Sequence, residues 1–318
     1  MKTVFIIDGG AGRVITSIPA LIKYSKNNPD DDFKICIHGW DSLLWGIPEL
    51  QDKVFNLESK GIFENIFLEA SRVIFPEPYR LPAYYRQEKS LVEAFDYLIN
   101  DSNDHTDLPN ITLPISKGEE MNTIIEIDKS QKEEFRKNKL NIVIQPWGST
   151  AKKINSYIID ESSRSMESWC FQKLIKKLSK NYNLFLFSDR NFWLENEKDT
   201  LKFEGDLRFW SSLIFCSDYF IGIDSVGQHI AKAHNIPGTV ILGSTFAENV
   251  SYPNHFNIFE KKGNKKYSPL RINGIDPHLA DRINNTRMDF SDEEIDELVK
   301  SIEKDIQLKV KNRKNNNV

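Results

Sequence analysis

Polar residues follow a short apolar run in the second half of the chain, in an order that suits phosphate binding. Residues 219–223 are predicted to form a buried strand, and Asp224, Ser225 and Gly227 come directly after it. A helix is expected by His229. A turn between the carboxyl end of a parallel strand and a helix presents main-chain N–H groups, which attract a diphosphate together with the helix dipole. The spacing therefore predicts a diphosphate site.

The residues of this turn also fit a simpler structural role. Gly227 is expected to let a ligand approach the main chain, because glycine has no side chain to block it. Asp224 and Ser225 are, however, residue types that cap helices, and His229 would then pack beneath the helix. Both interpretations stay open from the sequence.

The amino terminus contains a second strand, turn and helix. Residues 2–7 are β-branched and aromatic, residues 8–12 are glycine-rich, and residues 14–24 have helical apolar spacing with Pro19 as an irregularity. A dinucleotide-binding fingerprint requires a third glycine where Ile15 stands. The sequence therefore disfavours a dehydrogenase.

Both segments resemble glycosyltransferase family 9, the heptosyltransferase-like enzymes. The family's donor turn is Asp-Ser/Thr-Gly-x-x-His, and this chain departs from it at Val226, where glycine is usual. The family's first turn is Gly-Gly-x-Gly-Asp, followed by a helix with Thr-x-Pro-Ala-Leu. The positions that match are Asp224, Ser225, His229, Gly10, Gly12, Pro19, Ala20 and Leu21.

The resemblance implies a GT-B α/β fold, in which two Rossmann-like domains face a central cleft. Residues 1–135 are expected to form the acceptor-side domain with a polar linker, and residues 136–300 the nucleotide-sugar donor domain. Residues 301–318 would comprise the end of a terminal helix and a basic, disordered tail. A capping box at Ser291 begins that helix, which in such enzymes crosses back to the first domain.

Arg13 occupies the place where the family has an acidic residue that deprotonates the acceptor. Arginine stays protonated and cannot be a general base. We expect Arg13 to face the cleft and hold a phosphate or carboxylate, or else to pair with a nearby acid at the surface. Asp8, at the end of the first strand, and Asp41, after the second, are the candidate replacement bases.

Two aromatic segments are candidates for an acceptor surface. Trp40 and Trp45 flank Asp41 and would either stack on a sugar or base or close the core. Residues 77–80 and 84–86 interleave aromatic and cationic side chains in a loop that its prolines are expected to hold extended. That loop would contact an acceptor or form a polar contact between domains.

The remaining donor contacts rest on weaker matches to the family. Ser149 lies in the turn after a strand predicted at residues 140–144. Arg164, beyond an insertion, is either a donor-phosphate contact or a charge flanking a helix, and Asp206 opens a predicted helix near the ribose or base. The full predicted donor set is Gly12, Ser149, Arg164, Asp206, Asp224, Ser225, Val226, Gly227 and His229.

Composition limits the class of protein. The chain of 318 residues carries a net charge of −4 and no apolar run approaching the ~18 residues of a membrane span. No secretory signal is expected, because the first apolar run leads directly into the glycine turn. Cys36, Cys170 and Cys216 lack metal spacing and are expected to be reduced and buried in a cytoplasmic protein. We expect neither a metal nor a cofactor.

The predicted activity is metal-independent transfer of a sugar from a nucleotide-diphosphate sugar to an acceptor hydroxyl. The acceptor would be a hydroxymethylated pyrimidine in DNA, because the chain resembles divergent phage members of the family, or a lipopolysaccharide-type glycan. A phage enzyme would work in the host cytoplasm. The alternatives are a nucleotide-sugar 2-epimerase and an inactive nucleotide-sugar binder, and the oligomeric state is open. Lysines that would form a local basic patch for DNA are Lys261, Lys262, Lys265 and Lys266.

Overall fold

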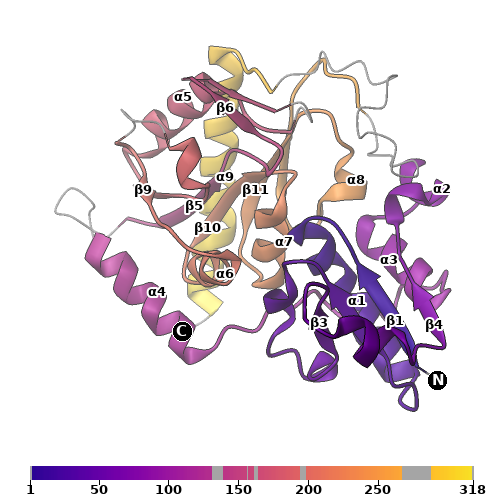
Figure 1. The fold of residues 1–318 in the computed structure, drawn as a ribbon. Coiled ribbons are helices and arrows are strands. Elements are labelled where there is room, and N and C mark those ends of the chain that lie inside the picture. The colour runs from indigo at the N-terminus through magenta and orange to yellow at the C-terminus, as the bar shows by residue number, and fades with distance from the viewer. Residues whose placement is uncertain are drawn as a thin grey trace. The chain divides into compact units, whose positions relative to one another are not determined.

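The computed structural model describes residues 2–130, 139–155, 157–160, 164–193, 198–266 and 288–316 (Figure 1). The chain divides into two compact units, and the described part of the first is residues 2–114. This division lies earlier in the chain than residue 135, where the sequence places the boundary.

The first unit is a parallel sheet with helices. Its strands are β1 (Thr3–Ile7), β2 (Lys34–Ile37), β3 (Val54–Asn56) and β4 (Arg72–Ile74). Its α-helices are α1 (Ala11–Asn27), α2 (Pro82–Tyr85) and α3 (Leu91–Asn100), and its shorter helical turns are Asp41–Leu44, Pro48–Leu50, Phe63–Phe67 and Pro78–Arg80. All four strands are parallel, in the order β3-β2-β1-β4.

Apolar side chains hold α1 against this sheet. The rings of Phe5, on β1, and Tyr24, on α1, meet edge to face at 4.8 Å, and Phe33 joins both. Such pairs stabilise a core beyond the area they bury. The predicted helix is confirmed, and it starts earlier, at Ala11, with Pro19 inside it.

The second unit contains a larger parallel sheet. Its strands are β5 (Asn141–Gln145), β8 (Asn183–Leu186), β9 (Leu201–Lys202), β10 (Tyr219–Ile223), β11 (Gly238–Leu242) and β12 (Asn257–Glu260), and β6 (Lys152–Ile154) and β7 (Tyr157–Ile159) form a separate hairpin. Its helices are α4 (Lys117–Ser130), α5 (Ser168–Leu178), α6 (Leu207–Phe215), α7 (Val226–Ala233), α8 (Ala247–Val250) and α9 (Asp292–Asn316), with a short turn at Arg190–Phe192. The strand order is β12-β11-β10-β5-β8-β9.

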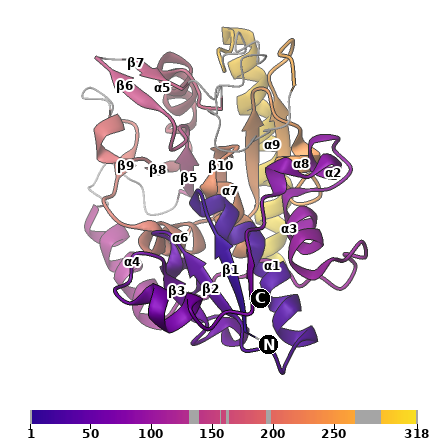
Figure 2. The ribbon, with the colours of Figure 1, turned by 45° about the vertical axis from the view of Figure 1, so that its right-hand side comes forward.

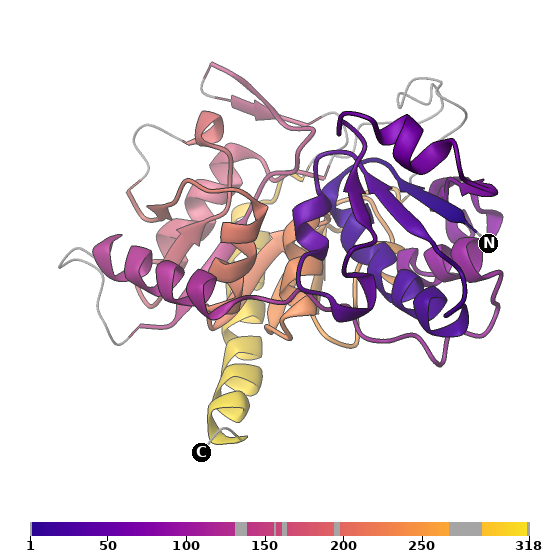
Figure 3. The same ribbon diagram turned by 60° about the horizontal axis from the view of Figure 1, so that its bottom comes forward.

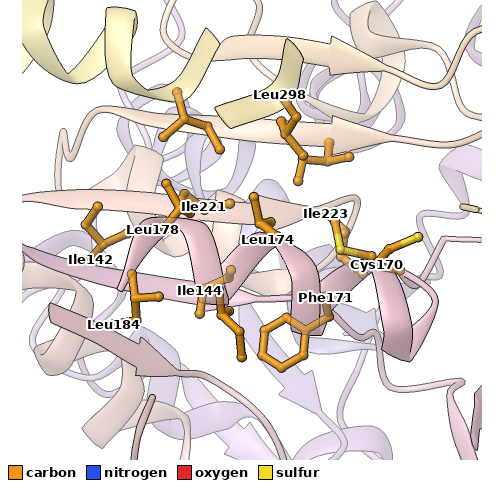
Figure 4. Packing of buried hydrophobic residues seen from close by; sticks show 14 of the residues in the cluster. Ile142, Ile144, Cys170, Phe171, Leu174, Leu178, Leu184, Ile221, Ile223 and Leu298 are labelled. Atoms are coloured by element: carbon orange, nitrogen blue, oxygen red, sulfur yellow. The ribbon is translucent and has the colours of Figure 1, made fainter. Parts of the chain in front are cut away.

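The core of this unit lies between the sheet and two helices. Leu174 and Leu178 of α5 point onto Ile142 and Ile221 of the central strands, and Leu298 reaches the same layer from α9 (Figure 4). These side chains are buried. The central strands contain continuous apolar runs, such as residues 142–144 in β5 and 219–223 in β10, as expected for parallel strands covered on both faces.

Two segments differ from the sequence-based expectations. Residues 117–130, predicted to be part of a linker, form α4, which packs on α6: Thr123 donates a 2.8 Å hydrogen bond to Ser212, and Arg208 pairs with Glu119 at 2.7 Å. The insertion after β5 forms the β6–β7 hairpin, shown in Figure 2. Contacts between residues far apart in the chain, such as those between α4 and α6, leave little trace in the local spacing of apolar residues.

The terminal helix is longer than predicted. The capping box at Ser291 is confirmed by its reciprocal hydrogen bonds with Glu294. The helix continues to Asn316, into the segment from Lys309 for which the sequence predicts disorder (Figure 3). It packs on α5, β11 and β12 and is grouped with the second unit.

Candidate functional site

In each sheet, successive strands are first added on one side of the starting strand and later on its other side. In the second unit, the chain moves from β5 outward to β8 and β9, then returns to β10 on the other side of β5. In the first unit, the same reversal falls between β1 and β4. Ligands of open α/β sheets bind beyond the carboxyl ends of the strands at this switch point. Both turns singled out from the sequence follow strands at a switch point.

The turn after β10 is tied to the end of β5 through one side chain. Gln145 donates a 3.2 Å hydrogen bond to the hydroxyl of Ser225 and accepts one of 2.9 Å from the N–H of Gly227. Ser225 caps α7 by position, although its hydroxyl makes no capping bond. The helix starts at Val226, earlier than the sequence predicts. One first-turn amide is therefore engaged inside the protein, and the helix dipole still points at the switch point.

Gly227 is required for internal packing. A β-carbon there would lie 2.4 Å from Oε1 of Gln145 and 2.8 Å from the ring of Phe220. Protein atoms already fill the space beside Gly227. Internal packing, rather than the approach of a ligand as expected, is therefore the reason for glycine at this position.

Asp224 is buried at the end of β10. Burial raises the pKa of its carboxyl group, and the nearby positive charge of Arg164 partly offsets that rise. Gln228 lies 3.5 Å from the carboxylate, and Arg164 donates a 3.4 Å hydrogen bond to the carbonyl oxygen of Asp224. The structure thus brings Arg164, distant in sequence, to the turn after β10.

His229 lies inside the second unit. A 2.7 Å hydrogen bond joins its Nδ1 to the hydroxyl of Tyr252. Burial lowers the pKa of His229 to about 3, so the ring is neutral at physiological pH. This geometry matches the alternative in which His229 packs beneath the turn.

The turn after β5 is closed by a carboxylate from the hairpin. Asp160 accepts hydrogen bonds from Thr150, at 2.8 Å, and from Ser165, whose hydroxyl also accepts the N–H of Gly148 at 2.9 Å. Ser149 lies exposed in this turn. These bonds hold the segment that carries Ser149 close to the segment that carries Arg164.

Asp206 lies apart from this group along the sheet. It follows the edge strand β9, which β8 separates from β5. Its carboxylate caps α6 by accepting the N–H of Phe209 at 2.9 Å. A contact from Asp206 to the ribose or base stays a prediction.

In the first unit, the glycine turn carries an exposed carboxylate. Asp8 follows β1 and accepts the N–H of Gly9 at 2.7 Å. Gly9 has a φ of +100°, a conformation that favours glycine. Gly12 is half-buried in the first turn of α1.

Arg13 is buried, contrary to the expectation that it faces a cleft in the open. Its side chain is 5% exposed, and it donates hydrogen bonds to Glu77 at 2.9 Å and to the carbonyl oxygen of Pro76 at 3.1 Å. The guanidinium also lies 5.3 Å from the ring centre of Tyr79. The alternative of pairing with a nearby acid therefore describes Arg13 better, with the pair inside the fold.

The segment around Glu77 is compact rather than extended. Residues 78–80 form a helical turn that Glu77 caps through the N–H of Tyr79, and α2 follows it. Tyr84 is fully buried. The prolines begin these helical turns, where a missing N–H does no harm.

Asp41 begins a short helical turn after β2 and accepts a 2.9 Å hydrogen bond from Asn56. Trp40 and Trp45 are both partly exposed, at 36% and 57%. They therefore do not close the core, and aromatic surface remains beside Asp41.

Among the described residues, no group of three or more His, Cys, Asp or Glu side chains is arranged to hold a metal ion. The thiols of Cys36 and Cys170 are buried and that of Cys216 is half-buried; burial raises the pKa of Cys36 to about 11. No helix in the described ranges has the length and apolar character to span a membrane.

Solved structures with the same architecture exist. The glycosyltransferase family 9 protein of Veillonella parvula matches with a TM-score of 0.70 and 11% identity, over 96% of this chain and 97% of that one. Escherichia coli ADP-heptose LPS heptosyltransferase II matches with a TM-score of 0.59 and 16% identity, over 94% and 98%. The chain has the GT-B fold.

A third match is the iron-containing dodecameric glycosyltransferase TibC of enterotoxigenic E. coli, with a TM-score of 0.63, 11% identity, and coverage of 98% of this chain and 79% of that one. No protein-family model and no curated protein sequence matches the chain. The fold class predicted from the sequence is confirmed. The three named structures are of bacterial proteins and lend no support to a phage-type member.

Three residues important to this geometry were not singled out from the sequence. Gln145 bridges β5 and the turn after β10, Asp160 closes the turn after β5, and Glu77 pairs with Arg13. Gln145 directly follows the strand predicted at residues 140–144, and that position at the end of a strand was a usable signal. Asp160 and Glu77 act through partners that only the fold brings near.

Proposed function

We propose that this GT-B protein is a glycosyltransferase that uses a nucleotide-diphosphate sugar. The observation that carries the proposal is the construction of the β5–β10 switch point. There the start of α7, the polar turn at Ser225 and the cationic side chain of Arg164 meet. A helix start and an arginine are the groups that bind diphosphates.

The donor diphosphate would lie beyond β5 and β10. Arg164 would neutralise the charge that develops as the diphosphate departs, and the dipole of α7 would add to that effect. Ser149 and Ser225 would donate hydroxyl hydrogen bonds. Asp224 supports the turn from inside, since its carboxyl group is buried beside Gln228.

Transfer requires one bond to form and one to break. The acceptor oxygen bonds to the anomeric carbon, and the bond from that carbon to the diphosphate oxygen breaks, with its electron pair leaving on the diphosphate. The acceptor proton must pass to a base. Asp8 and Asp41, in the first unit, are the bases that the sequence indicates, and Arg13 cannot take this role.

Among acceptors, we favour a glycan hydroxyl. Duplex DNA needs several unpaired cations to neutralise its phosphates. Here, Lys261 pairs with Glu294 at 2.6 Å and Lys262 with Glu297 at 2.8 Å, and Lys266 pairs with Glu260. The expected basic patch is therefore largely neutralised by neighbouring carboxylates.

Release of nucleoside diphosphate from a panel of nucleotide sugars tests the proposal. ADP-heptose belongs in the panel because a TibC complex contains ADP-D-β-D-heptose. The acceptor arms are a bacterial glycolipid core and DNA with hydroxymethylcytosine. Release that rises with the glycolipid core supports the proposal, and release that rises with DNA identifies the other acceptor.

Other outcomes separate the alternatives. Conversion of a donor without any acceptor indicates a 2-epimerase, and binding without turnover indicates an inactive binder. An arm with a metal chelator tests metal independence, because loss of transfer that returns with a divalent metal would refute that prediction.

A further inference from the structure

Glu77 lies at the switch point of the first unit. Strands β1 and β4 are neighbours, and Phe5 is paired in register with Ile74. Asp8 is three residues beyond Phe5, and Glu77 is three residues beyond Ile74. Because parallel neighbours present their carboxyl ends at the same edge, both carboxylates belong to the edge where ligands of such sheets bind.

The contacts of Glu77 hold it in one orientation. Oε2 accepts a 2.9 Å hydrogen bond from Arg13, and Oε1 accepts one of 3.3 Å from the N–H of Tyr79. A carboxylate has about four lone-pair sites, so these two bonds leave acceptor capacity on both oxygens.

Exposure distinguishes the two members of the pair. The Arg13 side chain is 5% exposed, whereas that of Glu77 is 21% exposed. The carboxylate is therefore the member that an incoming molecule can reach. Arg13 lies beneath it, also held by the carbonyl oxygen of Pro76 and the ring of Tyr79.

We infer that Glu77 is the group that accepts the proton of the acceptor hydroxyl, with Arg13 as its positioning residue. The inference rests on the proposed transferase activity. As the acceptor oxygen bonds to the anomeric carbon, its proton moves to a carboxylate oxygen of Glu77, and the electron pair of the broken bond leaves with the diphosphate. Arg13 keeps its own proton throughout.

The first test substitutes each candidate base with its amide. Glu77→Gln keeps the shape and one acceptor oxygen, so it removes the base with little change in packing. General-base catalysis contributes about 100-fold or more to a rate, and we expect kcat to fall by about that factor in Glu77→Gln. The matched control is Glu69→Gln, which changes an exposed carboxylate paired with Lys2 and should keep kcat within about threefold. Asp8→Asn and Asp41→Asn test the two other candidate bases.

Two further measurements exclude a purely structural role. Donor affinity of Glu77→Gln should stay near that of the wild type, and the acidic limb of its kcat–pH profile should disappear. Its melting temperature should fall, because the buried Arg13 loses its charged partner. The conservative variant Glu77→Asp keeps a carboxylate at the same position in the chain and should retain more of the rate than Glu77→Gln.

The outcomes are distinct. Wild-type transfer with undiminished kcat in Glu77→Gln overturns the inference, as does loss of kcat in Asp8→Asn or Asp41→Asn alone. Loss of donor affinity together with kcat in Glu77→Gln, with a folded Glu77→Asp variant that is no more active, also overturns it. Wild-type protein that binds donor and transfers nothing rejects the proposed function instead.

Discussion

The two switch points share the order of strand, turn and helix and differ in their chemistry. In the first unit, the helix after the central strand is anchored by charged pairs: Arg13 with Glu77 at its start and Lys23 with Asp96 further along. In the second unit, α7 is anchored by the neutral side chains of Gln145 and Gln228.

The difference follows from what each turn is proposed to receive. A diphosphate brings its own negative charge, so a turn of neutral hydrogen-bonding groups with one nearby arginine suits it. A hydroxyl that must lose a proton needs a carboxylate, and a buried arginine can hold that carboxylate in place. Under this proposal, one strand-turn-helix unit would serve two kinds of chemistry, decided by the residues around it.

The largest expected effect is on stability and comes from the buried pair of Lys23, on α1, and Asp96. Asp96 is fully buried and accepts hydrogen bonds from Lys23 at 3.2 Å and His105 at 2.6 Å. Asp96→Ala should lower the free energy of unfolding by about 3 kcal/mol, because Lys23, His105 and Asn100 all lose a fully buried carboxylate, although Lys23 keeps its ion pair with Asp107. Urea denaturation measures this. The control is Asp32→Ala, which removes an exposed partner of Lys34 and should cost at most about 1 kcal/mol; equal losses would contradict the comparison.

The next effect is on donor binding and concerns Arg164, the positively charged side chain at the switch point of the second unit. Arg164→Ala should weaken donor binding by about 10- to 100-fold, the value of a hydrogen bond to a charged group. Isothermal titration calorimetry with a nucleotide sugar measures this. Arg190, an exposed arginine paired with Glu204, provides the control. Unchanged affinity in Arg164→Ala would remove Arg164 from the proposed donor site.

A pair of glycine substitutions compares the two turns directly. Gly227→Ala should destabilise the second unit by about 1–3 kcal/mol, because the new methyl group meets Gln145 and Phe220. Gly10→Ala should cost less than about 1 kcal/mol, since nothing lies within 4 Å of the added carbon. Thermal unfolding of both variants shows the order, and a reversed order would mean that the packing around Gln145 is looser than described.

The smallest effect is a pH dependence confined to the second unit. The folded-state pKa of His229 is about 3 and its ordinary value is 6.5. Between these values the unfolded chain binds a proton that the folded protein does not, so stability falls as the pH drops below 6.5. The slope from this group is at most about 1.4 kcal/mol per pH unit. Denaturation between about pH 4 and pH 6 should show a shallower slope in His229→Gln; an identical slope would argue against this assignment.

Local patterns predicted the central elements of both units. The strand at Tyr219–Ile223 has the bounds expected from its apolar run, and the capping box at Ser291 begins α9 as predicted. The candidate donor residues in the turn after β10 were indicated by the sequence because a turn between strand and helix has a recognisable composition. Arg164 was indicated only by resemblance, since nothing local to it marks a site.

The sequence by itself determined two parallel α/β sheets and their glycine and polar turns, because burial on both faces imposes continuous apolar strands and turns need particular residue types. The tertiary structure alone decided which side chains meet: Gln145 with Gly227, Asp160 with Ser165, and Arg13 with Glu77. Such pairs join residues far apart in the chain, and charge, burial and hydrogen bonding act only between groups that the fold has brought together.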